Sequence, residues 1–209
     1  MRETDGGKGG VKAEEQRRAQ VQRRTKETDI ILSLVLDGEG EAEIATGVGF
    51  LDHMLTLLAV HGSFNLELSA KGDLEVDDHH TVEDIGICLG KALGEALGAK
   101  AGICRYGEAH VPMDETLVRV CLDLSNRPFL HYDVDLKDSR VGTFATELVK
   151  EFLWALALHG GITLHVDLLH GENTHHVIEA VFKALARALA QAVAPHATLQ
   201  GQLSSKGVL

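Results

Sequence analysis

The chain is 209 residues long, carries a formal net charge of −11 and contains three cysteines. This length is enough for one domain of good size or two small ones, and the acidic balance argues against nucleic acid or an anionic membrane as the main partner. Because the cysteines are odd in number and lack metal-ligand spacing, we expect neither a disulfide framework nor a zinc knuckle.

The N-terminal region lacks the hydrophobic stretch of a secretory signal, and no apolar run approaches the roughly 20 residues that cross a bilayer. We therefore expect a soluble, cytoplasmic protein. Residues 1–16 are rich in glycine and charge and offer almost nothing to bury, which predicts a disordered extension. The folded part is expected to begin near residue 17.

The first folded half has strand and helix patterns in alternation. Residues 29–36 alternate between polar and apolar, turn at 37–40 and continue as 41–46, which predicts a β-hairpin. Residues 49–62 have helical spacing, residues 64–72 are typical of a strand, and residues 79–98 predict a long amphipathic helix.

The same order then returns. A hairpin is predicted over residues 117–136, a helix over 143–160, a strand over 162–169 and a helix over 175–193. The last helix aligns with residues 79–98 without a gap at an offset of 96, and their apolar positions follow one 3.6-residue period. We infer an α+β fold of two duplicated β-β-α-β-α halves, about 17–103 and 104–209.

Each long helix begins with the pattern His-His-x-x-Glu. His79 and Glu83 are four residues apart and share a helix face, whereas His80 points about 100° away. One copy therefore offers a two-ligand clamp and one imidazole that is directed elsewhere. The second copy repeats this arrangement with His175, His176 and Glu179.

The duplication turns these clamps into two predicted metal sites. If the halves face each other across an approximate twofold axis, His176 completes the His79–Glu83 clamp. By the same symmetry, His80 completes the clamp of the second copy. A single copy is more often a solvated helix start behind an acidic cap than a set of metal ligands, but two copies at matching positions of a repeat favour metal ligation.

Two residues upstream match each other in the repeat and are natural fourth ligands, namely His53 and Glu151. Mixed imidazole and carboxylate ligation with open positions suits Mn²⁺, Fe²⁺, Co²⁺ or catalytic zinc better than a closed structural zinc site.

Six short motifs occur in order between about Arg17 and Leu209: GFLDHML, DDHHTVEDIG, VPMDE, DLSNRP, NTHHVIEAVFKALARAL and SSKGVL. With them the chain resembles the imidazoleglycerol-phosphate dehydratase family. The resemblance implies two four-stranded sheets with helices sandwiched between them, a ribosomal protein S5 domain 2-like fold. It also implies a homo-oligomer of 24 subunits built from trimers, with active sites between subunits.

The resemblance further implies two Mn²⁺ ions. One would lie on His53, His80, His175 and Glu179, and the other on His79, Glu83, Glu151 and His176. Many relatives have histidine where this chain has Glu151, and a carboxylate there still provides a ligand for Mn²⁺. The two halves that meet at a site can belong to different chains.

The implied activity is that of a hydro-lyase in L-histidine biosynthesis, which converts D-erythro-imidazole glycerol phosphate to imidazole acetol phosphate plus water. Two Lewis-acidic ions on the ring nitrogens would favour the imidazolate form, which helps to expel the adjacent hydroxyl. A base then takes the neighbouring proton. Glu27 resembles the family's acid/base glutamate, although its position alone is also that of a solvated charge at a strand edge.

The phosphate and the other polar groups of the substrate require fixed donors, and guanidinium groups suit bidentate phosphate binding. The resemblance assigns substrate contacts to Arg105, Arg127, Ser204, Ser205 and Lys206, with His61 and Lys183 as further candidates. His61 ends a short helix, where an imidazole can also simply satisfy the helix C-terminus.

Two other classes of function are compatible with the ligand pattern. A dinuclear metallohydrolase would use a metal-bound hydroxide. A non-catalytic metal store would also need many histidines in a metal-linked oligomer, but it would not need the arginines and the serine-lysine tail.

Overall fold

The computed structural model of the protein describes residues 16–207. The predicted disordered extension therefore lies outside the described residues, apart from Gln16. Among the described residues, no helix is both long enough and apolar enough to cross a membrane.

The first half contains four strands and two helices within the described residues, and its sheet has the order β1-β2-β4-β3. In chain order these elements are β1 (Arg18–Arg24), β2 (Thr28–Val35), β3 (Ala42–Ala45), α1 (Gly49–Gly62), β4 (Asn65–Gly72) and α2 (His79–Leu97).

The second half repeats this architecture, with the sheet order β5-β6-β10-β7. Its elements are β5 (Tyr106–Met113), β6 (Thr116–Asp123), β7 (Phe129–Asp133), α3 (Leu148–Gly160), β10 (Thr163–His170) and α4 (Thr174–Val193). A small ribbon, β8 (Arg140–Val141) and β9 (Phe144–Ala145), lies between β7 and α3. The duplicated α+β fold is thereby confirmed.

The predicted hairpins are wrong in both halves, and each half has one strand more than the predicted β-β-α-β-α order. The strand β2 forms its hairpin with β1, whereas β3 lies on the far side of β4 and runs parallel to it. The second half has the same arrangement, because β6 pairs with β5 and β7 pairs in parallel with β10.

The edge strand β1 escaped detection because its sequence, RAQVQRR, buries only Val21 and is otherwise polar. The connection from β2 to β3 is held at the start of β4 by the Asn65 side chain. Its Oδ1 accepts hydrogen bonds from the backbone N–H groups of Glu39 and Glu41, at 2.8 and 3.1 Å. A tertiary contact of this kind leaves no periodic pattern in the sequence.

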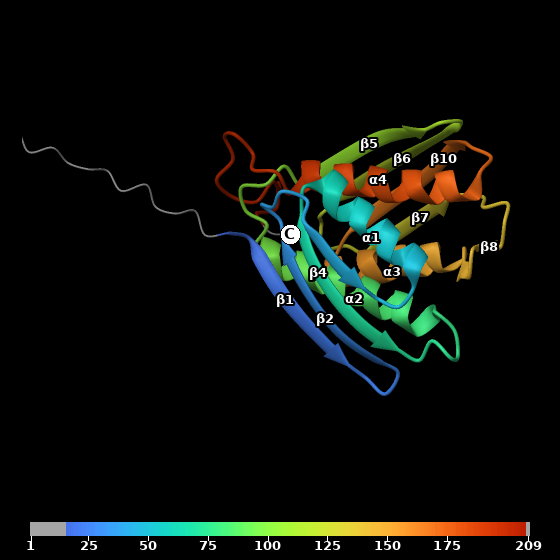
Figure 1. Cartoon of the computed structure of the whole chain (residues 1–209). Helices are drawn as coiled ribbons and strands as arrows, with labels where there is room; N and C mark the ends of the chain where they lie inside the picture. The colour runs from blue at the N-terminus through green and yellow to red at the C-terminus, as the bar shows by residue number, and fades with distance from the viewer. Residues whose placement is uncertain (1–15, 208–209) are drawn as a thin grey trace, which may run out of the picture.

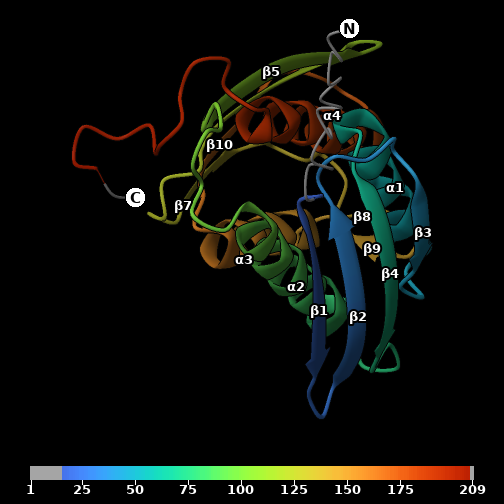
Figure 2. The ribbon, with the colours of Figure 1, turned by 90° about the vertical axis from the view of Figure 1, so that its left-hand side faces the viewer.

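The four helices form a layer between the two sheets (Figures 1 and 2). In the first half, α2 packs on β1 and β2, and α1 packs on β3 and β4. In the second half, α4 packs on β5 and β6, and α3 packs on β7. The two halves are joined by extensive contacts between helices, because α2 packs against α3 and α1 packs against α4. Each such pair therefore contains one helix from each half.

Close approach of α2 and α3 depends on two glycines of α2. A Cβ atom at Gly86 would lie 2.8 Å from the Phe152 carbonyl oxygen, and one at Gly90 would lie 2.8 Å from the Gly160 nitrogen. Both contacts are with backbone, which cannot rotate away as a side chain can. By contrast, a Cβ at Gly94 of the same helix would meet nothing within 4 Å.

We expect Gly86→Ala to destabilise the fold and Gly94→Ala to stabilise it. Alanine is favoured over glycine in a helix by about 1 kcal/mol, and overpacking a tight contact costs about 1–3 kcal/mol. The net change in the free energy of unfolding should therefore be negative at residue 86 and positive at residue 94. Urea denaturation of both variants followed by circular dichroism measures it, and equal stabilisation of the two variants would contradict the tight contact.

Candidate active site

The two His-His-x-x-Glu segments lie in the first turns of α2 and α4, as the periodicity predicts. The side chain of Asn173 caps α4, where its Oδ1 accepts hydrogen bonds from the backbone N–H groups of His175 and His176 at 3.0 and 3.3 Å. In front of α2, Asp77 Oδ1 accepts from the backbone N–H of His79 at 2.8 Å. The caps satisfy free helical N–H groups and fix where each histidine pair begins.

A group of potential metal ligands forms between α1 and α4. His53, His175 and Glu179 each offer one ligand atom, and these three atoms all lie within 4.8 Å of one another. The Nε2 atoms of His53 and His175 are 3.7 and 3.3 Å from Glu179 Oε2. Because α1 belongs to the first half and α4 to the second, the contact between the halves creates this group. Its imidazole and carboxylate donors fit a divalent cation.

Glu179 is 92% removed from solvent, with a relative exposure of 8%, and its charge is balanced by neighbours. Burial alone would raise its pKa, but the Lys183 ammonium, whose Nζ lies 2.5 Å from Oε1, and the nearby histidines hold the pKa below its ordinary value. His61 lies further along the same helix pair. Its pKa is lowered by burial and by the positive charges of Lys183 and Arg187.

The corresponding region between α2 and α3 is more open. His79 Nε2 lies 4.0 Å from Glu83 Oε2. Glu151 lies half-buried in the first turn of α3, which packs along α2. Within the described part of the chain, these three residues do not form a group with all ligand atoms inside 4.8 Å.

The remaining histidine of each pair is held by a carboxylate. His80 Nδ1 lies 2.9 Å from Asp73 Oδ2, and His176 Nδ1 lies 2.9 Å from Glu115 Oε2. These hydrogen bonds raise the pKa of both imidazoles. With Nδ1 occupied, each ring presents Nε2 as its ligand atom, the arrangement that orients histidine in many metal sites.

The completion of each clamp by the other half does not occur within one chain. His80 lies with Asp73 instead of joining the second-half clamp, and His176 lies with Glu115 instead of joining His79 and Glu83. The physical reason is the pairing of the helices, because α2 packs against the helix α3 and α4 packs against the helix α1.

Asp73 and Glu115 were missed by the sequence reasoning. A signal was available for Glu115, because it directly precedes β6 as Glu27 directly precedes β2. Glu27 therefore has a pseudo-equivalent that already contacts a histidine. No comparable repeat marks Asp73, whose role follows from the course of the β4–α2 loop.

Glu27 is exposed in the β1–β2 turn and lines a hollow of about 340 Å³ together with Asp73. Its negative charge contributes to the raised pKa of His80. The turn is anchored to α2 through Asp84, whose Oδ2 accepts a 2.5 Å hydrogen bond from Thr28 Oγ1 and whose Oδ1 pairs with Arg23 at 2.9 Å. The predicted base thus lies near the start of α2.

The predicted phosphate residues lie at the opposite end of the helix layer. Arg105 is buried and forms a two-point ion pair with Asp123, at 2.7 and 2.9 Å. It also donates to the carbonyl of Leu203, which docks the C-terminal tail with Ser204, Ser205 and Lys206 beside it. Arg127 is exposed, and its Nη2 is 3.6 Å from Asp123. In Figure 1 this tail lies at the end of the molecule where α2 and α4 finish.

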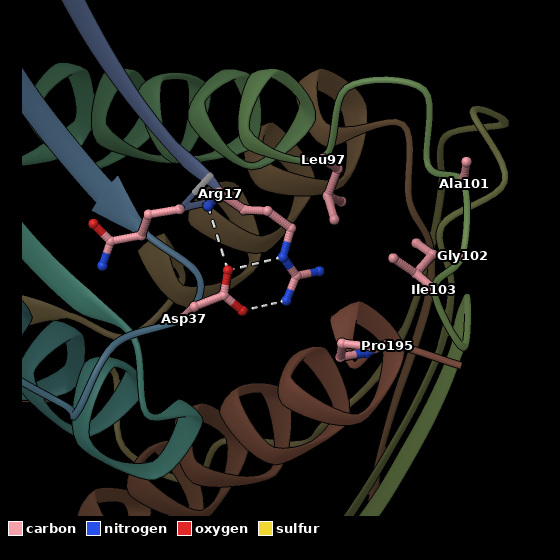
Figure 3. A pocket seen from close by; sticks show the side chains of 8 residues that line it. Arg17, Asp37, Leu97, Ala101, Gly102, Ile103 and Pro195 are labelled. Atoms are coloured by element: carbon pink, nitrogen blue, oxygen red, sulfur yellow. Dashed lines mark hydrogen bonds and ion pairs between the residues drawn. The ribbon is translucent and has the colours of Figure 1, made fainter. Parts of the chain in front are cut away.

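A cavity of about 580 Å³ opens at this same end (Figure 3). Its walls include Arg17 and Asp37, which form an ion pair, and the apolar side chains of Leu97, Ile103 and Pro195. None of the predicted site residues lines it, so its position does not mark the candidate active site.

The two groups of predicted residues are too far apart to serve one small substrate within one chain. Arg105 N donates to the carbonyl of Ala192, near the end of α4, whereas His175 lies in its first turn. The 20 residues of α4 correspond to about 30 Å at the helical rise of 1.5 Å per residue.

Comparison with known proteins shows close relatives. The family profile described as imidazoleglycerol-phosphate dehydratase matches residues 46–189, more than half of the chain. A relative of that name from Heliobacterium modesticaldum is 61% identical over 188 residues, covering 90% of this chain and 96% of the relative. One from Halalkalibacterium halodurans is 58% identical over 193 residues, covering 92% of this chain and 100% of the relative.

Solved structures agree with these relatives. The imidazoleglycerol-phosphate dehydratase of Staphylococcus aureus matches with a TM-score of 0.78 and 46% identity over 85% of this chain and 99% of that one. The enzyme from Pyrococcus furiosus matches with a TM-score of 0.79 and 43% identity, over 90% of this chain and 100% of that one. The protein is an enzyme of the lyase class, a dehydratase.

The chain belongs to the imidazoleglycerol-phosphate dehydratase family. This confirms the resemblance carried by the short motifs. The finding also removes the support for the metallohydrolase and metal-store alternatives.

The Arg105–Asp123 pair allows a test of what Arg105 does in the fold. We expect Asp123→Asn to lower the free energy of unfolding by about 3 kcal/mol, because it leaves a buried guanidinium without its counter-charge. The exposed Arg127→Gln is the control and should change stability by less than about 1 kcal/mol. Denaturant titration measures both, and limited proteolysis reports whether the tail is released in Asp123→Asn. Equal free energies of unfolding for Asp123→Asn and Arg127→Gln would show that the ion pair with Asp123 does not hold Arg105.

Proposed function

We propose that this enzyme converts D-erythro-imidazole glycerol phosphate to imidazole acetol phosphate and water, a step of L-histidine biosynthesis, in the cytoplasm. Support comes from family membership over most of the chain. The observation that carries the proposal is the convergence of His53, His175 and Glu179 from the two halves, next to Lys183.

We further propose that two Mn²⁺ ions are the cofactors. His53, His80, His175 and Glu179 would hold one ion, and His79, Glu83, Glu151 and His176 the other. When bound, the ions supply Lewis acidity that stabilises negative charge on the azole ring of the substrate. Imidazole nitrogens and carboxylate oxygens are the donor set that such an ion accepts. Glu151 would contribute a carboxylate oxygen to the second ion.

The side chains of the enzyme perform the proton transfers and hold the substrate. Glu27 takes the proton from the carbon next to the one that loses hydroxide, so that the C–H and C–O bonds break and an enol forms, which becomes the ketone. The hollow beside Glu27 and the anchoring of its turn by Asp84 favour a fixed position for this carboxylate. Arg105, Arg127, Ser204, Ser205 and Lys206 bind the phosphate, with His61 and Lys183 near the remaining polar groups.

The proposed site is completed by several copies of the chain in a homo-oligomer of 24 subunits built from trimers. The distances support sharing, because His175 and Arg105 lie near opposite ends of α4. His80 and His176, each held by a carboxylate of its own chain, would present Nε2 to ions that a neighbouring copy also binds.

Glu27→Gln should lower the turnover of imidazole glycerol phosphate by about 10²–10⁴-fold, the usual contribution of a general base. Manganese content should stay that of the wild type, because the proposed ligands are intact. Glu75→Gln is a matched control, since Glu75 lines the same hollow without an assigned role. Wild-type turnover in Glu27→Gln would remove this residue from the mechanism.

Shared sites can be tested by complementation. Glu27→Gln and Arg127→Gln copies, each of low activity alone, are co-expressed with different tags and mixed oligomers are isolated. Some sites then combine an intact Glu27 from one copy with an intact Arg127 from another, so activity should rise well above that of either parent. The double variant co-expressed with itself is the control. Mixed oligomers as inactive as the parents would place both residues of a site in one copy.

A further inference from the structure

The outer face of the second sheet carries another group of potential ligands, which shares no residue with the group of His53, His175 and Glu179. In the parallel pair β7–β10, His131 lies opposite His165 and Asp133 lies opposite Asp167. Alternate residues of a strand point to the same face, so these four side chains form a square array. The neighbouring Leu164 and Val166 are fully buried, which places the array on the side away from the core.

The donor atoms are already close to one another. His131, Asp133 and Asp167 each offer a ligand atom, and these atoms all lie within 4.8 Å of one another. His131 Nε2 is 3.6 Å from Asp167 Oδ1. Two donors on one tetrahedral ion with bonds of about 2.1 Å are about 3.4 Å apart. The His165 ring lies beside them, with its centroid 5.4 Å from that of His131.

A neighbouring cation orients one of the carboxylates. Both Nε and Nη2 of Arg119 lie 3.2 Å from Asp167 Oδ2, whereas Oδ1 of the same carboxylate faces His131. An outer partner that binds one oxygen and directs the other toward the ion is a common feature of metal sites. A simple ion pair between His131 and Asp167 would not require Asp133 or His165 at the same place.

The duplication provides an internal comparison. The corresponding parallel pair of the first sheet is β3–β4, where Glu43 lies opposite Glu67 and Ala45 opposite Ser69. No histidine stands at these four positions, although the backbone arrangement is the same. The array is therefore a property of the second half and is not a consequence of the fold.

We propose that His131, Asp133 and Asp167, with His165 as the fourth donor, bind a divalent ion of the zinc type at a site separate from the candidate active site. Zinc accepts imidazole nitrogen and carboxylate oxygen in a four-coordinate arrangement. Divalent zinc and copper bind such nitrogen-containing sites more tightly than manganese does. This site therefore differs in its metal preference from the proposed manganese sites. A bound ion would link the edge strand β7 to β10.

The direct test is crystallographic. Crystals of the wild-type protein grown with Zn²⁺ are measured on both sides of the zinc absorption edge. We expect an anomalous peak between His131 and Asp167. A map in which zinc peaks occur elsewhere but none lies at this position would overturn the proposal.

A solution test uses matched variants. The zinc content per chain is measured by elemental analysis after dialysis against a fixed free zinc concentration. The double variant His131→Gln/Asp133→Asn should contain one zinc ion fewer per chain than the wild type. The control Glu43→Gln/Glu67→Gln changes the corresponding first-sheet positions and should match the wild type.

Dehydratase turnover should be the same in the wild type, the double variant and the control variant, which separates this site from the catalytic one. Equal zinc content in the double variant and the wild type would contradict the proposal. If the double variant does not fold, the wild-type crystal still decides the question.

Discussion

The structure depends on one packing arrangement, in which each helix pair of the central layer takes one helix from each half. The contacts of α1 with α4 and of α2 with α3 bury much of the apolar surface of both halves. The same contacts place His53 of the first half beside His175 and Glu179 of the second. Because the donors sit on packed helices, the forces that hold the core together also fix the geometry of the candidate site.

Carboxylates of the chain itself then divide the histidines into two kinds. His53, His79 and His175 lie near a glutamate on their own or the adjoining helix, whereas His80 and His176 are bound through Nδ1 to Asp73 and Glu115. The histidines of the second kind have a fixed orientation, but within one chain they do not join the His-Glu pair of the other half. Under the proposed function, the active site would form only on assembly, since the proposed ligands and the proposed phosphate-binding residues would come close only where copies of the chain meet.

The sequence predicted the parts of the site that recur in the duplication. The starts of α2 and α4, the histidine pairs and the matching positions of His53 and Glu151 follow from helical period and repeat register. The sequence did not predict Asp73, because its contact with His80 depends on a loop. It also assigned β3 and β7 to hairpins, because strand patterns reveal that a strand exists but not which strand lies beside it.

By itself, then, the sequence determined the duplication, the α+β class, the residue types of the site and the family, because these are carried by local periodicity and short motifs. Only the tertiary structure decided which helices pair, and therefore which of these ligands meet in one chain. It also placed Arg105 at the far end of α4 from His175 and gathered His131, Asp133 and Asp167 on one sheet face. Such placements depend on contacts between residues far apart in the sequence, and no periodic pattern records them.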